Sequence, residues 1–238
     1  MKIIAIDSSG LVATVAVASE DSLIAEYTVN FKKTHSQTLL PMLDEICKMI
    51  GLSMDEVDAI AVAGGPGSFT GLRIGSATAK GLAFAINKPI ISVPTVDALS
   101  MNGWGIDGLI VPIMDARRNQ VYTGFYEFDE EGNHVVVKEQ FAEDIVKVIE
   151  ELNDKGKRVL FLGDAVPVYE DIIRENMKVP FKFAPIHMNR QRAGALATLA
   201  IKYYEQGKYE DGAEHSPTYL RMSQAERERA EAEKQKEQ

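Results

Sequence analysis

Residues 2–18 read KIIAIDSSGLVATVAVA, which is two apolar runs separated by a short polar turn. The runs Lys2–Ile6 and Ala13–Ala18 have the composition of strands, and the aspartate, serines and glycine between them are typical of a turn. We therefore predict a β-hairpin that turns at Asp7. A third run over Ser22–Val29 extends the hairpin to a three-stranded meander.

A second window of the same form lies 108 positions further along the chain. Asp115 stands 108 residues after Asp7, and Tyr122 stands 108 residues after Thr14. Both windows consist of an apolar strand, an aspartate, a short turn and another apolar strand. Duplicated actin-like lobes explain this spacing. Coincidence is the alternative, because this arrangement is common.

The remaining pattern alternates strands and helices, which predicts an α/β fold with two lobes. Further strands are predicted over Val57–Ala63, Pro89–Val93, Leu109–Met114, Val121–Phe128 and Arg158–Leu162. Helices are predicted over His35–Ile50 with Thr34 as N-cap, Thr70–Ile86, from about Thr95, Glu143–Asn153, Ala165–Asn176 and Arg192–Gln206. We expect one lobe over 1–107, a second over 108–222, and a charged helical tail over 223–238, for which docking is an alternative to a solvated helix.

Composition limits the classes of function. The chain has 238 residues, a net charge of −9 and a single cysteine, Cys47. One cysteine excludes an internal disulfide framework and is typical of a reducing compartment. No run has the length of a membrane span or of a signal peptide, so we expect a cytoplasmic protein. The acidic balance disfavours direct binding of nucleic acid, so we expect any contact with RNA to come through a partner.

The segment Gly64–Gly75, GGPGSFTGLRIG, joins a buried strand to a helix. Its glycines could expose backbone N–H groups to an anion at a helix N-terminus. They could equally permit a tight turn and close helix packing. The segment is not a Walker loop, because the lysine and hydroxyl pair is absent.

The two turn aspartates raise the possibility of a nucleotide site. Asp7 could lie near a metal–phosphate group, or it could simply form the turn. The second turn has Arg117 and Arg118 where phosphates would need open backbone. These arginines could bind a phosphate, fill the cleft or pair with a carboxylate.

A metal site is not predicted. The chain has four scattered histidines, none paired at the spacing that presents two ligands: His35, His134, His187 and His215. Cys47 lies on the apolar stripe of a helix and is interpreted as an inert buried thiol. We therefore identify no catalytic residue.

Five segments together resemble the TsaB family, and the resemblance covers the chain up to Arg221. They are IAIDSS, THSQTLLPML, AGGPGSFTGLRIGSATAKGLAFAINKPIISVPTVDAL, MDARRNQVY and PTYLR. The resemblance implies an actin-like (ASKHA) fold of two lobes, each a mixed sheet with flanking helices. It also implies a role in making N6-threonylcarbamoyladenosine in tRNA, with two partners: TsaD, the larger paralogous transferase, and the ATPase TsaE.

One departure from the transferase paralog bears on activity. TsaD-like chains carry a metal-binding HxxxH motif after the strand that corresponds to KPIISV. Here residues 94–98 read PTVDA, without a histidine. The resemblance therefore implies a non-catalytic subunit that binds and activates TsaD. The alternatives are a small-molecule kinase or ATPase of the same fold and, last, a metallopeptidase.

The resemblance places the partner surface on the two helices of the first lobe. Its residues would come from a pool that also contains core positions: Leu39, Met42, Leu43, Ile46, Met49, Arg73, Ile74, Ala77 and Lys80. The same surface could close a homodimer in the absence of TsaD. Residues that could face a nucleotide are Asp7, Ser8, Gly65 and Gly67. No cofactor is expected in the chain itself, and ATP or ADP only at the interface of the complex.

Overall fold

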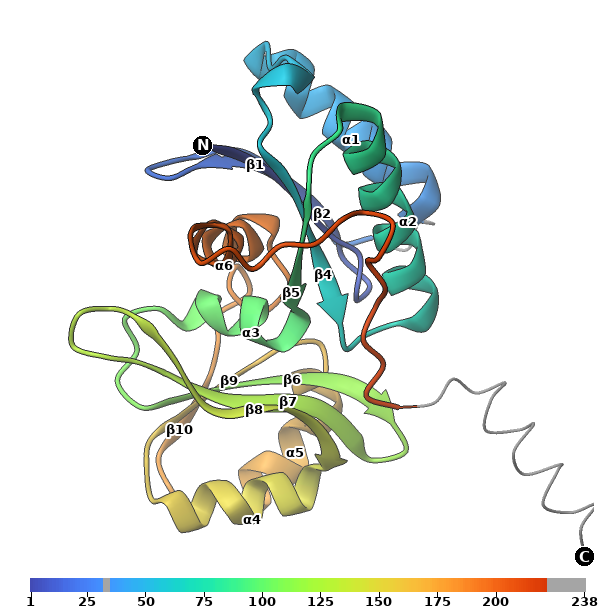
Figure 1. Cartoon of the computed structure of the whole chain (residues 1–238). Coiled ribbons are helices and arrows are strands. Elements are labelled where there is room, and N and C mark those ends of the chain that lie inside the picture. Colours follow the sequence, from blue (N-terminus) through green and yellow to red (C-terminus); the bar gives the residue numbers. More distant parts are fainter. Residues whose placement is uncertain (32–34, 222–238) are drawn as a thin grey trace, which may run out of the picture.

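The computed structural model describes residues 1–31 and 35–221, which form two lobes, each around its own sheet (Figure 1). The predicted N-cap Thr34 and the predicted tail over 223–238 lie outside the described residues. None of the helices in 1–31 and 35–221 has the length and apolar character needed to cross a bilayer.

The first sheet has the strand order β3-β2-β1-β4-β5. Its strands are β1 (Lys2–Asp7), β2 (Ala13–Ser19), β3 (Leu23–Val29), β4 (Ala59–Gly65) and β5 (Ile90–Pro94). The meander β1–β2–β3 is antiparallel, whereas β1, β4 and β5 run parallel. The central strands β1, β2 and β4 are buried almost throughout, as their apolar sequences predict.

The second sheet repeats this arrangement with the order β10-β9-β6-β7-β8. Its strands are β6 (Leu109–Arg117), β7 (Gln120–Phe128), β8 (His134–Asp144), β9 (Val159–Leu162) and β10 (Phe181–Phe183). Again the first three strands are antiparallel, and β6, β9 and β10 are parallel. The two sheets therefore have the same mixed topology, and each half of the chain supplies one actin-like lobe.

The helices also follow one order in both halves. They are α1 (His35–Ile50), α2 (Phe69–Ile86), α3 (Thr95–Ser100), α4 (Ile145–Lys155), α5 (Val166–Asn176) and α6 (Ala193–Glu205), with short 3₁₀ turns η1 (Met54–Glu56) and η2 (Met101–Gly103). Each half runs strand, strand, strand, helix, strand, helix, strand, helix, apart from these turns. This shared order supports duplication over coincidence as the origin of the spacing seen in the sequence.

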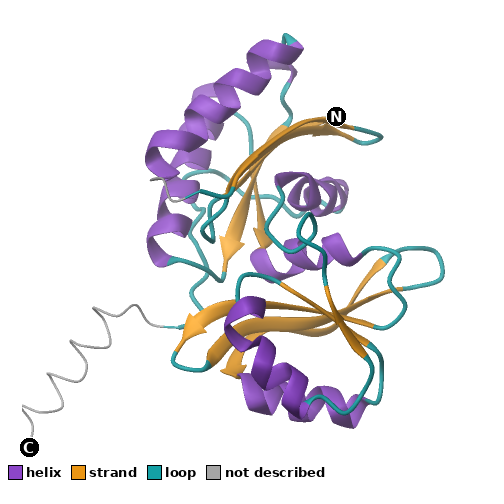
Figure 2. Cartoon of the chain, turned by 180° about the vertical axis from the view of Figure 1, so that it is seen from behind, coloured by secondary structure: helices purple, strands orange, loops and turns teal. Residues whose placement is uncertain are grey.

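The last helix of each half contacts the other lobe. The helices α1 and α2 lie side by side on one face of the first sheet, and α6 covers the opposite face of that sheet (Figures 1 and 2). The short helix α3 packs on β6 and β7 of the second sheet. The prediction that 108–222 forms the second lobe is therefore wrong for α6, because its small apolar side chains complete the core of the first lobe.

The hairpins of the two lobes differ by one residue in register. Asp7 pairs with Thr14 in the first lobe, whereas Asp115 pairs with Val121 in the second. The ladder of the second hairpin is irregular between Asp115 and Arg117. The predicted correspondence of the aspartates therefore holds at the strand ends, and the second turn is tighter than the first.

Candidate functional site

Two surfaces of the molecule were predicted to carry function. One is the cleft between the lobes, beside the two hairpin turns, and the other is the outer side of α1 and α2. The cleft has a volume of about 740 Å³ and is bounded by both lobes. Among the residues that line it are Ser9, Gly67, Ala116, Arg190 and Arg221.

The turn of the first hairpin holds a buried carboxylate. Asp7 is 1% exposed, and its Oδ1 accepts the N–H of Ser9 at 2.8 Å and the hydroxyl of Ser9 at 2.6 Å. Burial raises the pKa of Asp7 to about 6, although the two hydrogen bonds from Ser9 favour the charged form. The Asp7 side chain is therefore spent on forming the turn.

The glycine-rich segment packs directly on this turn. The N–H of Ser68 donates to the carbonyl of Ser9 at 2.7 Å. A Cβ at Gly67 would stand 2.4 Å from that carbonyl oxygen, and a Cβ at Gly71 would stand 2.1 Å from the carbonyl oxygen of Ser8. Because real Cβ atoms do not approach so closely, the glycines permit close packing of α2 on the hairpin. The packing interpretation is favoured over the anion-binding one.

The residues predicted to face a nucleotide separate into two groups. Gly67 lines the cleft. Asp7, Ser8 and Gly65 are buried beneath it, and the hydroxyl of Ser8 donates to the carbonyl of Gly71 at 2.9 Å. Sequence reasoning missed His35, which lines the cleft and whose Nε2 donates to the carbonyl of Gly10 at 2.8 Å.

The second hairpin turn is more open. Arg117 Nη1 lies 3.3 Å from Asp115 Oδ2, and the Arg117 side chain is 87% exposed. Of the predicted roles, pairing with a carboxylate is the one that the geometry shows. Arg117, Arg118 and Asn119 all have positive φ, between 57° and 67°, a conformation that costs non-glycine residues energy. Asp164 accepts the N–H of Asp115 at 3.2 Å, and burial raises the pKa of Asp164.

The stretch that replaces the paralog's metal motif forms the start of α3. Asp97 lies there, and its Oδ1 accepts the hydroxyl of Tyr126 at 2.7 Å. Burial raises the pKa of both groups. His134 bonds to Ser100 at 2.7 Å, and burial lowers its pKa to about 4. In the described part of the chain, no three histidine, cysteine, aspartate or glutamate side chains are arranged to hold a metal ion.

The pool of predicted interface residues divides by exposure. Four of its members on α1 belong to the core of the first lobe and are at most 5% exposed: Leu39, Met42, Leu43 and Ile46. They pack against the sheet, because the stripe that looked wide enough for two surfaces serves mainly one. Ile74 is partly buried against the same core, and Lys80 is half-buried. Met49, Arg73 and Ala77 remain exposed.

Two large apolar residues of the same helices were missed. Phe84 of α2 is 89% exposed and Leu40 of α1 is 50% exposed. Phe84 follows Ala77 by seven residues, which places both on one side of α2. That spacing was readable in the sequence. The end of α2 also borders a groove of about 900 Å³, whose other wall is the segment 209–213.

Comparisons with known proteins agree with this architecture. A sequence model described as "TsaD: tRNA N6-adenosine threonylcarbamoyltransferase" matches residues 23–229. The tRNA threonylcarbamoyladenosine biosynthesis protein TsaB of Bacillus subtilis is 36% identical over 229 residues, which is 95% of this chain and 96% of that protein. The protein of the same name from Escherichia coli is 35% identical over 134 residues, 56% of this chain and 58% of that one.

A solved structure has the same fold. It is that of an uncharacterized Pseudomonas aeruginosa protein with similarity to peptidase YeaZ. It is 25% identical, superimposes with a TM-score of 0.76, and covers 92% of this chain and 99% of that one. Because the likeness to the Bacillus subtilis protein runs along nearly the whole of both chains, the chain belongs to the TsaB family.

Proposed function

We propose that the chain acts in the formation of threonylcarbamoyladenosine in tRNA as a non-catalytic subunit that binds and activates a TsaD-type transferase. The names of its relatives support the process. The description of the matching family supports the transferase as the reaction concerned. The observation that carries the role of a binding subunit is the exposed apolar side of α1 and α2.

That side combines large apolar residues with small ones. Met49 is 75% exposed and Phe84 is 89% exposed, and between Phe84 and Ala77 on α2 lies the exposed Gly81. A Cβ at Gly81 would meet nothing within 4 Å, so this part of the helix is open to a partner. Methionine and aromatic side chains are enriched in protein interfaces, and small residues let helices approach closely. The surface therefore fits the helices of a second, similar lobe.

The contacts at the cleft support a partner that performs the chemistry. Asp7 and Ser8, the polar side chains in the first turn nearest to a possible phosphate, are hydrogen-bonded within the hairpin and to α2. We assign threonylcarbamoyl transfer to TsaD and ATP hydrolysis to TsaE. We assign any nucleotide held with this chain to its interface with the partner, and contact with tRNA to the assembled complex, because the chain carries a net charge of −9.

The proposal is tested by measuring threonylcarbamoyladenosine in tRNA. Purified TsaD and TsaE, with the threonylcarbamoyl-adenylate donor, are mixed with tRNA in the presence and absence of this chain. We expect modification only when the chain is present. A full rate without it would refute the proposed role.

Two matched variants locate the surface. Phe84→Glu places a charge on α2, and Ile186→Glu places one on a loop residue that is 95% exposed. We expect Phe84→Glu to abolish co-elution with TsaD and tRNA modification, and Ile186→Glu to retain both. Equal behaviour of the two variants would contradict the proposed surface. Without TsaD, the same surface is proposed to close a homodimer, and sedimentation of Phe84→Glu should then show a monomer.

A further inference from the structure

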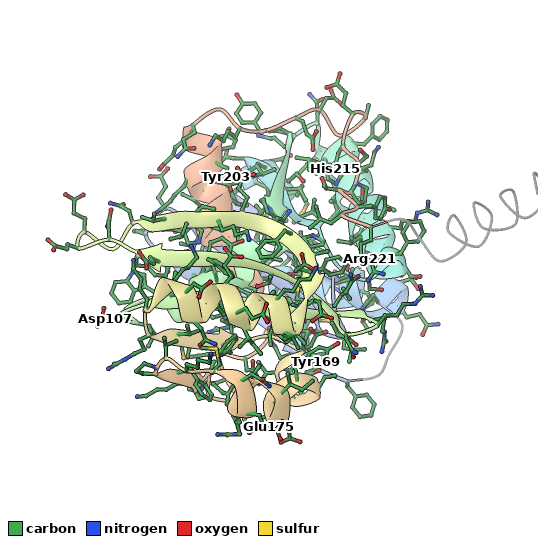
Figure 3. The ribbon with its side chains drawn as sticks, turned by 90° about the horizontal axis from the view of Figure 1, so that it is seen from below. Asp107, Tyr169, Glu175, Tyr203, His215 and Arg221 are labelled. Carbon is green, nitrogen blue, oxygen red and sulfur yellow. The ribbon has the colours of Figure 1, made fainter. Side chains whose placement is uncertain are left out.

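The residues Ser216–Arg221, here called the strap, contain the late PTYLR segment, which the proposed function leaves without a role. After α6 the chain crosses the edge of the first sheet, where Glu210 and Ile90 exchange two backbone hydrogen bonds of 2.9 Å. It then descends beside α2 toward the second lobe (Figures 1 and 3). Lys80 of α2 holds its approach by donating to the carbonyls of Ala213 and His215 at 3.2 and 3.0 Å.

The middle of the strap is joined to the first lobe. The N–H of Thr218 donates to the carbonyl of Gly64 at 2.7 Å. A Cβ at Gly65 would stand 2.2 Å from the carbonyl oxygen of Thr218, so the strap lies directly on the glycine backbone. Next to this contact, the ring of Tyr219 packs on the ring of Phe69 with centroids 4.8 Å apart.

The end of the strap is joined to the second lobe. Arg221 Nη1 donates to the carbonyl of Ala116, in the second hairpin, at 2.5 Å. Only three residues separate this contact from the one made by Thr218, and three extended residues span about 10 Å. Because both ends are held, the lobes cannot separate on this side unless one contact breaks.

Other bonds fasten the lobes near the same glycines. Gln140 of β8 donates from Nε2 to the carbonyl of Gly65 at 3.2 Å. Tyr126 of β7 donates to Asp97 of α3, which follows directly on the first sheet. The glycine backbone therefore receives one donor from the strap and one from the second sheet.

We propose that the strap is an intramolecular clamp that fixes the separation of the two lobes across the cleft. Arg221 and Thr218 are its two points of attachment, and Gly64 and Gly65 are the surface on which it lies. The clamp holds the cleft at one width, where a hinged pair of lobes would open and close. This inference stands independently of the proposed partner, because every contact lies within one chain.

The clamp is tested by a distance measured between the lobes of the full chain. Spin labels are attached at Glu45→Cys on α1 and Glu150→Cys on α4, both exposed positions, with Cys47→Ala removing the native thiol. We expect a narrow distance distribution in this background and a broadened one when Arg221→Ala is added. Arg174→Ala, which removes an exposed ion pair to Glu170, is the matched arginine control and should leave the distribution narrow.

Hydrogen exchange gives the second readout. Loss of a hydrogen bond from a charged group should speed exchange of the Thr218 amide by about tenfold or more in Arg221→Ala. Tyr219→Ala, which leaves both hydrogen bonds in place, should speed exchange less. Circular dichroism confirms that each variant is folded. An unchanged distance distribution in folded Arg221→Ala would overturn the proposal, even if the strap amides exchanged faster.

Discussion

The hairpin turns of the two lobes contain the same local bond in two different surroundings. In each, the aspartate Oδ1 accepts the N–H of the residue two positions later at 2.8 Å: Ser9 for Asp7, and Arg117 for Asp115. Yet Asp7 is 1% exposed, whereas the Asp115 side chain is 18% exposed and pairs with an arginine in solvent. The turn motif alone therefore does not determine the chemistry of its carboxylate.

The difference lies in what covers each turn. The glycines of α2 and its preceding loop bring helix backbone onto Ser8 and Ser9, which buries the first turn. The second turn has three residues with positive φ at its tip and an arginine that extends into solvent. We conclude that the covering helix, rather than the hairpin, distinguishes the lobes. The predictions below test this, from the largest expected effect to the smallest.

Filling the space between α2 and the first turn should have the largest effect. A Cβ in Gly71→Ala would stand 2.1 Å from the carbonyl oxygen of Ser8. Since backbone must move to relieve this overlap, we expect a loss of about 3 kcal/mol or more in the free energy of unfolding. Gly81→Ala, on the open side of the same helix, should instead gain about 0.5–1 kcal/mol. Urea denaturation of both variants decides whether close packing is needed.

Removing the buried charge should reveal its cost. The pKa of Asp7 rises from 3.8 to about 6 on folding, so its contribution to stability is complete below pH 3.8 and is lost as the pH rises through 6. Asp7→Asn keeps an oxygen acceptor for Ser9 without the charge. We therefore expect Asp7→Asn to be more stable than the unmodified chain by about 3 kcal/mol at pH 7.5, with no difference near pH 3.5.

The same substitution in the second turn provides the control. Asp115→Asn loses only an exposed ion pair with Arg117, so we expect a change within about 1 kcal/mol at pH 7.5. Both variants are compared by urea denaturation at the two pH values. Equal effects of Asp7→Asn and Asp115→Asn would show that burial of the first turn has no energetic consequence.

Deleting the side-chain contact of each aspartate gives a smaller contrast. Ser9→Ala removes the hydroxyl that donates to Asp7 at 2.6 Å and leaves a buried carboxylate with less support. We expect it to cost about 1–2 kcal/mol at pH 7.5. Arg117→Ala removes a partner in solvent, so its effect should stay within about 0.5 kcal/mol. Thermal unfolding of the pair measures the difference, and a costlier Arg117→Ala would reverse our view of the two turns.

The smallest effect is expected at the tip of the second turn. Arg118 has a φ of 57°, and glycine adopts this conformation without steric cost. Its greater freedom in the unfolded chain offsets part of the gain, so we expect Arg118→Gly to stabilise by about 0.5 kcal/mol. A loss of stability in thermal unfolding would mean that the arginine side chain supports the turn.

Much of the fold was readable from the sequence because local patterns decide it. The helix predicted over His35–Ile50 has exactly these bounds, and the two hairpins lie where their turn residues indicated. The strand β8 was missed because its exposed run Val135–Val137 breaks the alternation expected of a half-buried strand. The three-residue β10 was missed because it is too short to show a pattern.

The role of the glycines could be read only in part. Residue type indicated either close packing or anion binding near Gly64–Gly75, and the choice depends on what approaches the backbone. The closest neighbours are Ser8 and Ser9, at least 55 residues earlier, and Thr218, about 150 residues later. Such tertiary contacts have no local signature. The buried positions Leu39 and Met42 were uncertain for the same reason, because an apolar stripe does not reveal whether it faces core or partner.

The placement of α6 has a consequence for synthesis on the ribosome. The inner residues of that helix complete the second core of the first lobe, against side chains such as Ile3 and Ala5 at the opposite end of the chain. Until Ala193–Glu205 has left the exit tunnel, this face of the nascent sheet has no cover. Folding that depends on such distant contacts is slow, and uncovered apolar strands are prone to aggregate. The first lobe to be translated is therefore among the last parts to be finished.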